Sequence, residues 1–550
     1  MKQPSFPQSL RMSEPTTHLK RRRLRVPRGD GGVLLEPSVP DAVVAAVSNH
    51  DRLEAAAGLD LQGRTLGQMR QMARSELLAS AYRYTSEFRS DITLQADPGP
   101  IIVTGHQPEL FHPGVWVKNF AAAAVARQSG GTAINLVVDN DFCDSAMIRV
   151  PVPGPKGLRF ERVTIADRLP PQPWEERSAD PQQLATFASR VAQPMAAWNL
   201  PEPAADQMAF DQRPGRLADQ LTQVRSNLEA SRGLTNLELP ISRLAETESF
   251  FRFVCHLLVN IERFHEVHNQ TLVDYRHRNG LRSKTHPVPA LETKDGWWET
   301  PFWTWREGDR SRQRLLAQQR TDNLLAISDG IRVLAELPLG PGMDACCAAE
   351  VLLQLSTSGD RIRPRALTNT IFSRMLFADL FIHGIGGAKY DEMTDAILSD
   401  FYGIKPPEFM TCSATLHLLG DRATDATPEK VEQLQRQARA LRFRAEDALA
   451  DSTDPEIKVL VDEKRTLIDQ QNAAENTDSQ ANRARYRRFR EINKRLAKQT
   501  LAQREELEAE IEATQAELQQ NALLRSRDLS FALYPPARLW SLFDSITDHA

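Results

Sequence analysis

The sequence predicts an α/β protein with a parallel-sheet core, followed by a long C-terminal α-helical coiled coil. Between residues 101 and 138, a strand-like run, a loop, an Ala-rich helical run and a second strand-like run follow one another, which is typical of a βαβ unit. After residue 426, apolar residues recur in steps of three and four, the period of a coiled-coil seam. At 550 residues, with 41% hydrophobic and 25% charged residues, the chain is long enough for several globular domains.

Composition also excludes some classes of function. The formal net charge of −4 argues against a protein that binds nucleic acid through bulk positive charge. No apolar run approaches the roughly 18–20 residues of a membrane helix. The five cysteines lack the CxxC spacing of zinc sites and fit a reducing compartment, so we expect a cytoplasmic protein with no nucleic-acid or membrane partner. The adjacent Cys346 and Cys347 are interpreted as small buried helix residues rather than a redox pair.

The predicted elements follow in order along the chain. Residues 1–37, rich in Pro, Gly and Arg, are expected to form a disordered basic tail. A core over residues 38–425 begins with a helical segment. It continues with strands at Ile101–Val103 and Ala133–Val138, on either side of a helix at Phe120–Arg127.

Two insertions are expected to interrupt this core. The first, near residues 150–240, carries many prolines. The second, near residues 280–345, contains the aromatic, irregular stretch Trp297–Trp305, which we interpret as core or lid rather than as a base-stacking platform. A further α/β-like block from Ala345 to about Leu419 completes the core.

The apolar period after the core predicts a coiled-coil arm over residues 426–527. A polar break at residues 472–481 indicates an antiparallel hairpin of two long helices, about 40–60 Å in length. Because a small monomer cannot bury the seams of such an arm, we expect a homodimer formed through the coiled coil. Residues 528–550 are expected to be a tail that packs on the core.

A polar loop follows the first predicted strand. Ligands of open α/β sheets bind at the carboxyl ends of strands, and this loop offers hydroxyl, imidazole, amide and backbone N–H groups to phosphate or acyl oxygens. The following helix adds its N-terminal partial charge and a lysine. The alternative is a structural loop whose histidines satisfy backbone groups. The candidate binding residues here are Thr104, Gly105, His106, Gln107, His112 and Lys118.

The second predicted strand ends in Asp139-Asn140-Asp141. Three acceptors at the carboxyl end of a strand can hold an amine or a ribose hydroxyl, or act as a base. The same residue types are common in an Asx turn, which is the structural alternative. Their position beside the polar loop of the neighbouring strand favours a functional role.

A glycine-rich turn follows the apolar run that ends at Ile382. As a dinucleotide fingerprint it is incomplete, because the last Gly of GxGxxG and the acidic partner are missing. It predicts a tight strand-to-helix turn at which a ligand approaches backbone amides, with a purely structural turn as the alternative. The candidate residues are His383, Gly384, Gly386 and Tyr390, with Ser413 expected nearby after a short strand at Phe409–Thr411.

In this order, the motifs resemble those of the bacillithiol synthase family, cysteine ligases that add cysteine to glucosaminyl-malate. The family's TGQQxGLxxGP loop is similar to Thr104–Gly114, and its Asp-His-Asp is similar to Asp139–Asp141. Its GGPGExxY turn is similar to Gly384–Tyr390, and its SATL-type segment to Ser413–Leu416. The family's C-terminal coiled coil is similar to Pro428–Arg525.

The resemblance covers about residues 40–540 and implies a Rossmann-like core with inserted connective domains and a dimerising coiled coil. It also implies a reaction that joins the α-carboxyl of cysteine to a sugar amine. Because carboxylate and amine do not condense in water, an activated acyl intermediate is implied, with ATP and its Mg²⁺ as the candidate source of activation. In that reaction His106 would act as acid or base, and Asp139 and Asp141 would hold or deprotonate the amine. No tightly bound cofactor and no metal site of the protein's own is expected.

The sequence departs from the family pattern in three places. His106 stands where the family has Gln, Asn140 stands where it has His, and the turn at His383–Gly387 lacks the family's Glu. Another acceptor, another amino acid or no activity therefore remain open. The first loop also resembles the HQPxFxPWxG opening of WbqC-like proteins, which are linked to sugar and amino-acid modification. A non-catalytic scaffold that uses the arm for partners is the remaining alternative.

Overall fold

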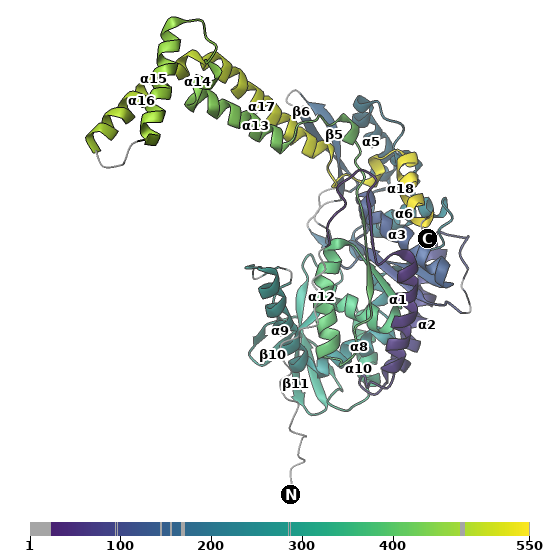
Figure 1. Cartoon of the computed structure of the whole chain (residues 1–550). Coiled ribbons are helices and arrows are strands. Elements are labelled where there is room, and N and C mark those ends of the chain that lie inside the picture. Colours follow the sequence, from purple (N-terminus) through teal and green to yellow (C-terminus); the bar gives the residue numbers. More distant parts are fainter. Residues whose placement is uncertain are drawn as a thin grey trace. The chain divides into compact units, whose positions relative to one another are not determined.

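The computed structural model describes residues 24–93, 95, 97–143, 146–154, 157–166, 171–283, 285–286, 288–473 and 479–548. The chain forms two compact units. The first contains Met1–Val152, Arg159–Leu416 and Arg527–Ala550, and the second contains Pro153–Leu158 and His417–Ser526. Figure 1 shows both units, the first with a mixed arrangement of strands and helices and the second built from helices.

A six-stranded sheet forms the centre of the first unit. Five of its strands are parallel and one edge strand, β1, is antiparallel. In spatial order the strands are β1 (Val33–Glu36), β16 (Phe409–Ala414), β15 (Leu380–His383), β2 (Ile101–His106), β3 (Thr132–Val137) and β8 (Leu237–Pro240). The predicted α/β class with a parallel sheet is therefore confirmed.

Helices cover both faces of this sheet. On one face, α3 (Pro113–Ser129) packs on β2, β3 and β16, and α6 (Leu217–Ala230) is joined to it by hydrogen bonds from Trp116 and Asn119 to Glu229. The other face packs against the helices of a large apolar core. Those helices include α2 (Leu66–Ser86), α8 (Glu248–Val259) and α10 (Cys346–Thr357).

Further helices of the first unit complete the fold around the sheet. They are α1 (Val39–Ala55), α4 (Pro181–Ala185), α5 (Phe187–Met195), α7 (Ile241–Leu244), α9 (Ile261–Asn279), α11 (Ala366–Phe372), α12 (Ile385–Asp400) and α18 (Pro536–Asp548). Among the described residues, no helix combines the length and the apolar character needed to cross a membrane.

The predicted N-terminal tail is wrong for its last residues. Val33–Glu36 forms β1 and pairs with β16 from Val33 to Glu36, because its apolar residues can complete the sheet edge. The basic cluster Lys20–Arg23 lies outside the described residues. The interpretation of the paired cysteines is also wrong in part. They begin α10, but Cys347 is exposed, and the two sulfur atoms lie 3.6 Å apart.

The first predicted insertion ends earlier than expected. After β3 the chain forms the strands β4 (Phe142–Cys143), β5 (Met147–Gly154), β6 (Gly157–Thr164) and β7 (Gln172–Pro173), then short helices. It returns to the central sheet at β8, whose residues had been assigned to the insertion. An apolar run of only four residues gave no strand signal distinct from the helices around it.

The aromatic stretch is regular rather than irregular. It forms β10 (Trp297–Arg306), which lies in a second, antiparallel sheet between β11 (Gln313–Thr321) and β14 (Asp360–Pro364). Phe302 and Trp305 are buried, because both faces of this strand are covered. The sheet also contains β9 (Thr293–Lys294), β12 (Leu324–Ser328) and β13 (Val333–Leu337).

The C-terminal segment Arg527–Ala550 belongs to the first unit. Phe531 lies 4.3 Å from Trp116 of α3 between ring centroids, and Phe543 stacks on Phe120 at 4.1 Å. Phe531 and Phe543 are fully buried, so this segment completes the apolar layer outside α3.

The second unit contains more helices than the predicted hairpin. They are α13 (Pro428–Phe443), α14 (Ala445–Ala448), α15 (Pro455–Ala473), α16 (Ser479–Gln499) and α17 (Leu501–Leu524). α13 and α17 lie side by side and antiparallel, with hydrogen bonds from Thr500 to Leu441 and from Asn521 to Ala426. α15 pairs with α16, where Ile492 and Leu496 are fully buried. The prediction of two helices missed the breaks at Arg444, at residues 449–454 and at Thr500.

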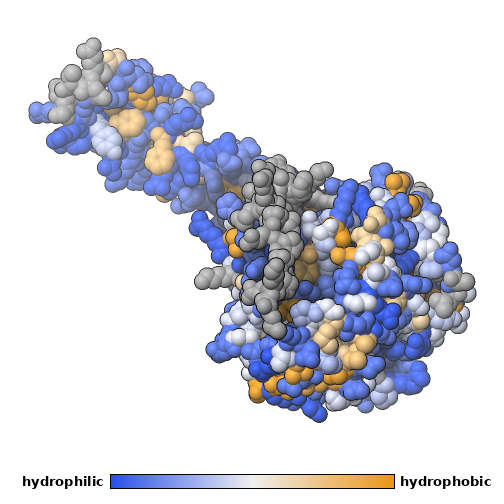
Figure 2. All heavy atoms as spheres, turned by 90° about the horizontal axis from the view of Figure 1, so that it is seen from below, coloured by the Kyte–Doolittle hydropathy of each residue, from blue (hydrophilic) through white to orange (hydrophobic). Residues whose placement is uncertain are grey.

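On the face shown in Figure 2 the surface of this unit is mostly hydrophilic.

Candidate functional site

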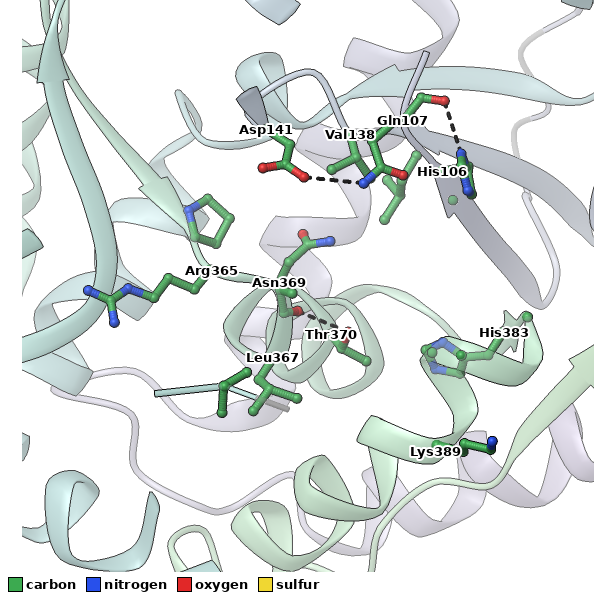
Figure 3. A pocket seen from close by; sticks show the side chains of 18 of the residues that line it. His106, Gln107, Val138, Asp141, Arg365, Leu367, Asn369, Thr370, His383 and Lys389 are labelled. Carbon is green, nitrogen blue, oxygen red and sulfur yellow. Dashed lines mark hydrogen bonds between the residues drawn. The ribbon is translucent and has the colours of Figure 1, made fainter. Parts of the chain in front are cut away.

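A cavity of about 820 Å³ lies at the carboxyl ends of the parallel strands. The segments that follow β2, β3 and β15 form one side of it, and residues of α11 and β10 lie across from them. Figure 3 shows Asp141, Gln107 and His106 on one side, with Asn369 and Thr370 of α11 facing them. The predicted site residues that line the cavity are Gly105, His106, Gln107, Lys118, Asn140, Asp141, His383, Gly384, Gly386 and Ser413.

His106 ends β2 and faces the cavity. Its Nδ1 lies 3.2 Å from the Gln107 carbonyl oxygen, and because a carbonyl accepts, Nδ1 carries the proton and Nε2 remains an acceptor. Burial, together with the Lys118 cation nearby, lowers the pKa of His106 to about 3. The imidazole is therefore neutral at pH 7, able to accept a proton or hydrogen bond but not to act as an acid.

Lys118 lies on α3 behind the same loop. Its Nζ donates a hydrogen bond to the Gly105 carbonyl over 2.6 Å, and only 4% of the residue is exposed. Burial lowers the pKa of Lys118 to about 8. At pH 7 it is a buried cation at the edge of a cavity, which favours an anionic group or a developing oxyanion there.

The residues after β3 point in different directions. Asp141 accepts hydrogen bonds from the Gln107 side chain at 3.2 Å and from Arg312 at 3.0 Å, so both partners hold its carboxylate beside the cavity. Asn140 donates from Nδ2 to the Pro364 carbonyl at 3.0 Å. Asp141 also accepts from the amide of the next residue, Phe142, at 3.0 Å, whereas an Asx turn would need the amide two residues further on.

Asp139 does not line the cavity. Its carboxylate accepts from the Ser242 backbone amide at 2.9 Å and from the Ser242 hydroxyl at 2.5 Å, and only 2% of the residue is exposed. Burial and the nearby Glu175 carboxylate raise the pKa of Asp139 to about 7, against the opposing effect of the Ser242 hydrogen bonds. Its contacts are those of a residue that ties the end of β3 to α7.

The glycine-rich turn joins β15 to α12. His383 lies 2.9 Å from Asp391 through Nε2, and its ring stacks on Phe381 at a centroid distance of 4.4 Å. Burial alone would raise the pKa of Asp391. The combined effect of Arg374 and His383 is larger and lowers that pKa to about 2, so this carboxylate is charged and orients the histidine. A Cβ at Gly384 or at Gly386 would meet no atom within 4 Å, so the first turn of α12 is open to a ligand.

The remaining predicted residues have other roles. Thr104 donates to the Ile382 carbonyl at 3.0 Å and connects β2 to β15. His112 is the N-cap of α3 and accepts from the Gly114 amide at 2.9 Å. Tyr390 packs in a small apolar cluster beside the cavity. Ser413 does line the cavity and accepts a hydrogen bond from Arg527 at 3.2 Å.

Several lining residues were not anticipated from the sequence. They come from segments distant along the chain. Those with charged or hydrogen-bonding groups are His268, Trp303, Arg312, Arg365, Thr368, Asn369, Thr370, Lys389 and Arg527. Arg365 and Arg312 both stack on Trp303, with guanidinium carbons 4.0 and 4.4 Å from the ring centroid. The closely spaced arginines at residues 361–365, followed by Thr-Asn-Thr at 368–370, were the available signal.

Part of the cavity lining could hold a phosphate group. The open first turn of α12 presents backbone N–H groups, and Lys389 on that helix is exposed and lines the cavity. Within the part of the chain that the structure describes, no group of three or more His, Cys, Asp or Glu residues could hold a metal. In sequence comparisons, no protein-family model and no curated protein matches this chain.

Proposed function

We propose that this protein is an amide-forming ligase of the bacillithiol synthase type. It would join cysteine, or a related amino acid, to the amine of an amino-sugar conjugate such as glucosaminyl-malate through an activated acyl intermediate. The observation that carries the proposal is the convergence of the segments after β2, β3 and β15 on one cavity beside the buried cation Lys118. The first unit would then be a Rossmann-like core with connective insertions.

The side chains of the cavity suit the steps of such a reaction. An amine that attacks an acyl carbon forms one C–N bond and loses one proton as the leaving group departs. Neutral His106 and the carboxylate of Asp141 are the acceptors available for that proton. Lys118 would stabilise negative charge on the acyl oxygen. Asp139, bound to Ser242 outside the cavity, would support the β3 end rather than contact the amine.

ATP, when bound with Mg²⁺, would supply the leaving group that a free carboxylate lacks. Gly384 and Gly386 leave room for its phosphates at the first turn of α12, and Lys389 would add a positive charge. Asp391, in the second turn of α12, lies 2.9 Å from His383 Nε2 and holds this histidine in place, so this wall of the cavity is preorganised.

We further propose that the second unit forms a homodimer. On α16 five of the six exposed cations recur in steps of three and four and therefore share one face of the helix. They are Arg483, Arg487, Arg490, Lys494 and Lys498. On α17 the exposed acids are Glu505, Glu506, Glu508, Glu510, Glu512 and Glu517. Two copies in antiparallel arrangement would bring opposite charges together.

The decisive experiment is an assay with cysteine, glucosaminyl-malate and ATP, read by mass spectrometry for the amide product. Binding is measured first by thermal shift, because a ligand at a hundredfold excess over its dissociation constant stabilises the folded state by about 2.7 kcal/mol. We expect the variant Lys118→Met to be inactive. Lys405 is exposed and lies away from the cavity, so Lys405→Met is the matched control. A well-folded protein that binds none of the three compounds would contradict the ligase and favour the scaffold.

A further inference from the structure

Two adjacent cysteines, Cys346 and Cys347, begin α10. Their sulfur atoms lie 3.6 Å apart, Cys347 is exposed and Cys346 is partly exposed. Among the described residues that line the cavity at the strand ends, neither cysteine appears, so the proposed ligase reaction does not use them. Two thiols that lie together at the surface are candidates for sulfur chemistry of their own.

The other cysteines of the chain differ from this pair. Cys143, Cys255 and Cys412 are buried. Burial raises the pKa of Cys412 to about 12 and also raises the pKa of Cys255. Because the thiolate is the nucleophile, a buried thiol that keeps its proton is inert toward reagents in solution. We therefore expect reactions with dissolved disulfides to be confined to Cys346 and Cys347.

The surroundings of the pair give the two thiols different roles. The Cys346 amide donates to Asp344 Oδ1 at 2.7 Å. The Cys347 sulfur and the Asp344 carboxylate accept hydrogen bonds from the Cys346 thiol and raise its pKa, so Cys346 keeps its proton. Cys347 is the more exposed of the two, and the N-terminal partial charge of α10 favours its thiolate. Cys347 is therefore the nucleophile of the pair.

The first turn of α10 can change without loss of the packing of the helix. The amides of a first helical turn have no partners within the helix, and that of Cys346 bonds to the Asp344 side chain instead. The buried residues that anchor α10 begin at Ala348 and continue with Ala349 and Leu352. A movement of the two sulfur atoms from 3.6 Å to bonding distance would therefore disturb little apolar contact.

A disulfide between neighbouring residues is a labile bond. The Cα atoms of adjacent residues lie about 3.8 Å apart, whereas disulfides usually join Cα atoms about 4.4–6.8 Å apart. The strain makes the bond easy to reduce, and strained or exposed disulfides are the ones that serve regulation or catalysis. Such a bond suits the reducing compartment expected for this chain, where disulfides are transient.

We propose that Cys346 and Cys347 form a thiol–disulfide exchange site that reacts with small-molecule disulfides. The Cys347 thiolate attacks one sulfur atom of the disulfide, the S–S bond breaks, and one small thiol leaves with the proton that Cys347 released. Cys346 then attacks the sulfur of Cys347, and the second small thiol leaves with the proton of Cys346. Both cysteines are oxidised to a vicinal disulfide and the small disulfide is reduced to two thiols, so no other reactant is needed. The site does not depend on the proposed ligase reaction.

The probe is bis(2-hydroxyethyl) disulfide, a small uncharged disulfide, added to the full-length protein. Acid stops the exchange, the chain is unfolded, free thiols are alkylated, and the tryptic peptides are weighed by mass spectrometry. The tryptic peptide of residues 333–361 contains Cys346 and Cys347 and no other cysteine. We expect it to have lost both thiol hydrogens and to carry neither an alkyl group nor a probe adduct. The peptides with the buried cysteines should be alkylated and free of adduct.

Variants separate the roles of the two thiols. In Cys346→Ser the probe should remain as a mixed disulfide on Cys347, because no second thiol can displace it. In Cys347→Ser the reaction of the remaining thiol should be roughly tenfold slower or more, since Cys346 holds its proton. Cys143→Ala, at a buried cysteine, is the matched control and should react like the wild type. Circular dichroism and the thermal midpoint show that each variant is folded.

Three results would overturn the proposal. The first is a native protein that does not react although its urea-unfolded form does. The second is a wild-type protein in which the adduct on Cys347 persists, because Cys346 then does not displace it. The third is a disulfide between two chains on a non-reducing gel, which would mean that the pair reacts with another copy. If the proposal holds, dithiothreitol should restore both thiols, because the strained bond is readily reduced.

Discussion

Lys118 Nζ donates to the carbonyl oxygen of Gly105, 2.6 Å away, at the edge of the cavity. The contact holds a buried positive charge directly behind the loop that begins with His106. A protein that only needed to close this space would use an apolar side chain, since burial of an ammonium group is costly. A functional role therefore explains the buried Lys118 better than a contribution to stability does.

For Lys118→Met we expect turnover to fall at least a hundredfold while stability at pH 7 stays equal or rises. The pKa of Lys118 is lowered to about 8, so the unfolded chain binds the proton more strongly between about pH 8 and its ordinary value. Wild-type stability should therefore increase across that range as pH rises, and the variant should lack this increase. Urea unfolding from pH 7 to 10 measures it, with Lys405→Met as control. A variant that is inactive because it is unstable would contradict the functional role.

His106 should also make the stability of the wild type increase with pH, but in the acid range. Its folded-state pKa of about 3 lies below the ordinary value, so the unfolded chain takes up the proton as pH falls below about 6.5. Between pH 7 and pH 5 this costs about 1–2 kcal/mol of stability, which His106→Gln should recover. Turnover of His106→Ala should drop tenfold or more without unfolding. Unchanged turnover would remove His106 from the reaction.

Asp139 has the opposite dependence on pH. Its pKa is raised to about 7, so the folded protein holds the proton that the unfolded chain has already lost. Its contribution to stability is present at low pH and is lost as pH rises through about 7. Asp139→Asn keeps the geometry toward Ser242 without the charge. Its stability relative to the wild type should grow by about 2–3 kcal/mol between pH 5 and pH 8. Denaturant unfolding at both values measures the difference, and a constant difference would refute the raised pKa.

The homodimer should depend on salt. At 1 M ionic strength the Debye length is about 3 Å, against about 10 Å at 0.1 M, so pairing between the α16 cations and the α17 acids would weaken. Light scattering should show a dimer at low salt that dissociates as salt is added. Deletion of Thr427–Arg525 should give a monomer at all salt concentrations. A dimer that persists after the deletion would place the interface elsewhere.

Local patterns predicted the first unit better than the second. The Ile101–Val103 run and the Ala-rich helix gave β2 and α3, although β2 continues to His106 because Thr104, Gly105 and His106 also pair with β3. In the second unit the apolar period continues through Arg444 and Thr500, where the helices break. Period alone cannot detect such breaks.

In the site too, the residues at strand ends could be predicted from the local sequence, and those brought in by long-range contacts could not. His106 ends β2, Gly384 directly follows β15 and Asp141 lies in the segment after β3, so the rule that ligands bind at strand ends located them. Asp139 was misplaced because neighbouring residues point in different directions, and its partner Ser242 lies about a hundred residues further along the chain. Arg365 reaches the cavity only because β14 pairs with β10, a contact that no local pattern encodes.

The packing of Phe531 on Trp116 also has a consequence for synthesis of the protein. About 400 residues separate the two side chains, which a ribosome adds in roughly 20–80 s at 5–20 residues per second. During that interval the outer face of α3, including Trp116 and Phe120, lacks its covering layer. The nascent chain therefore carries an uncovered aromatic surface until its last helix has been made.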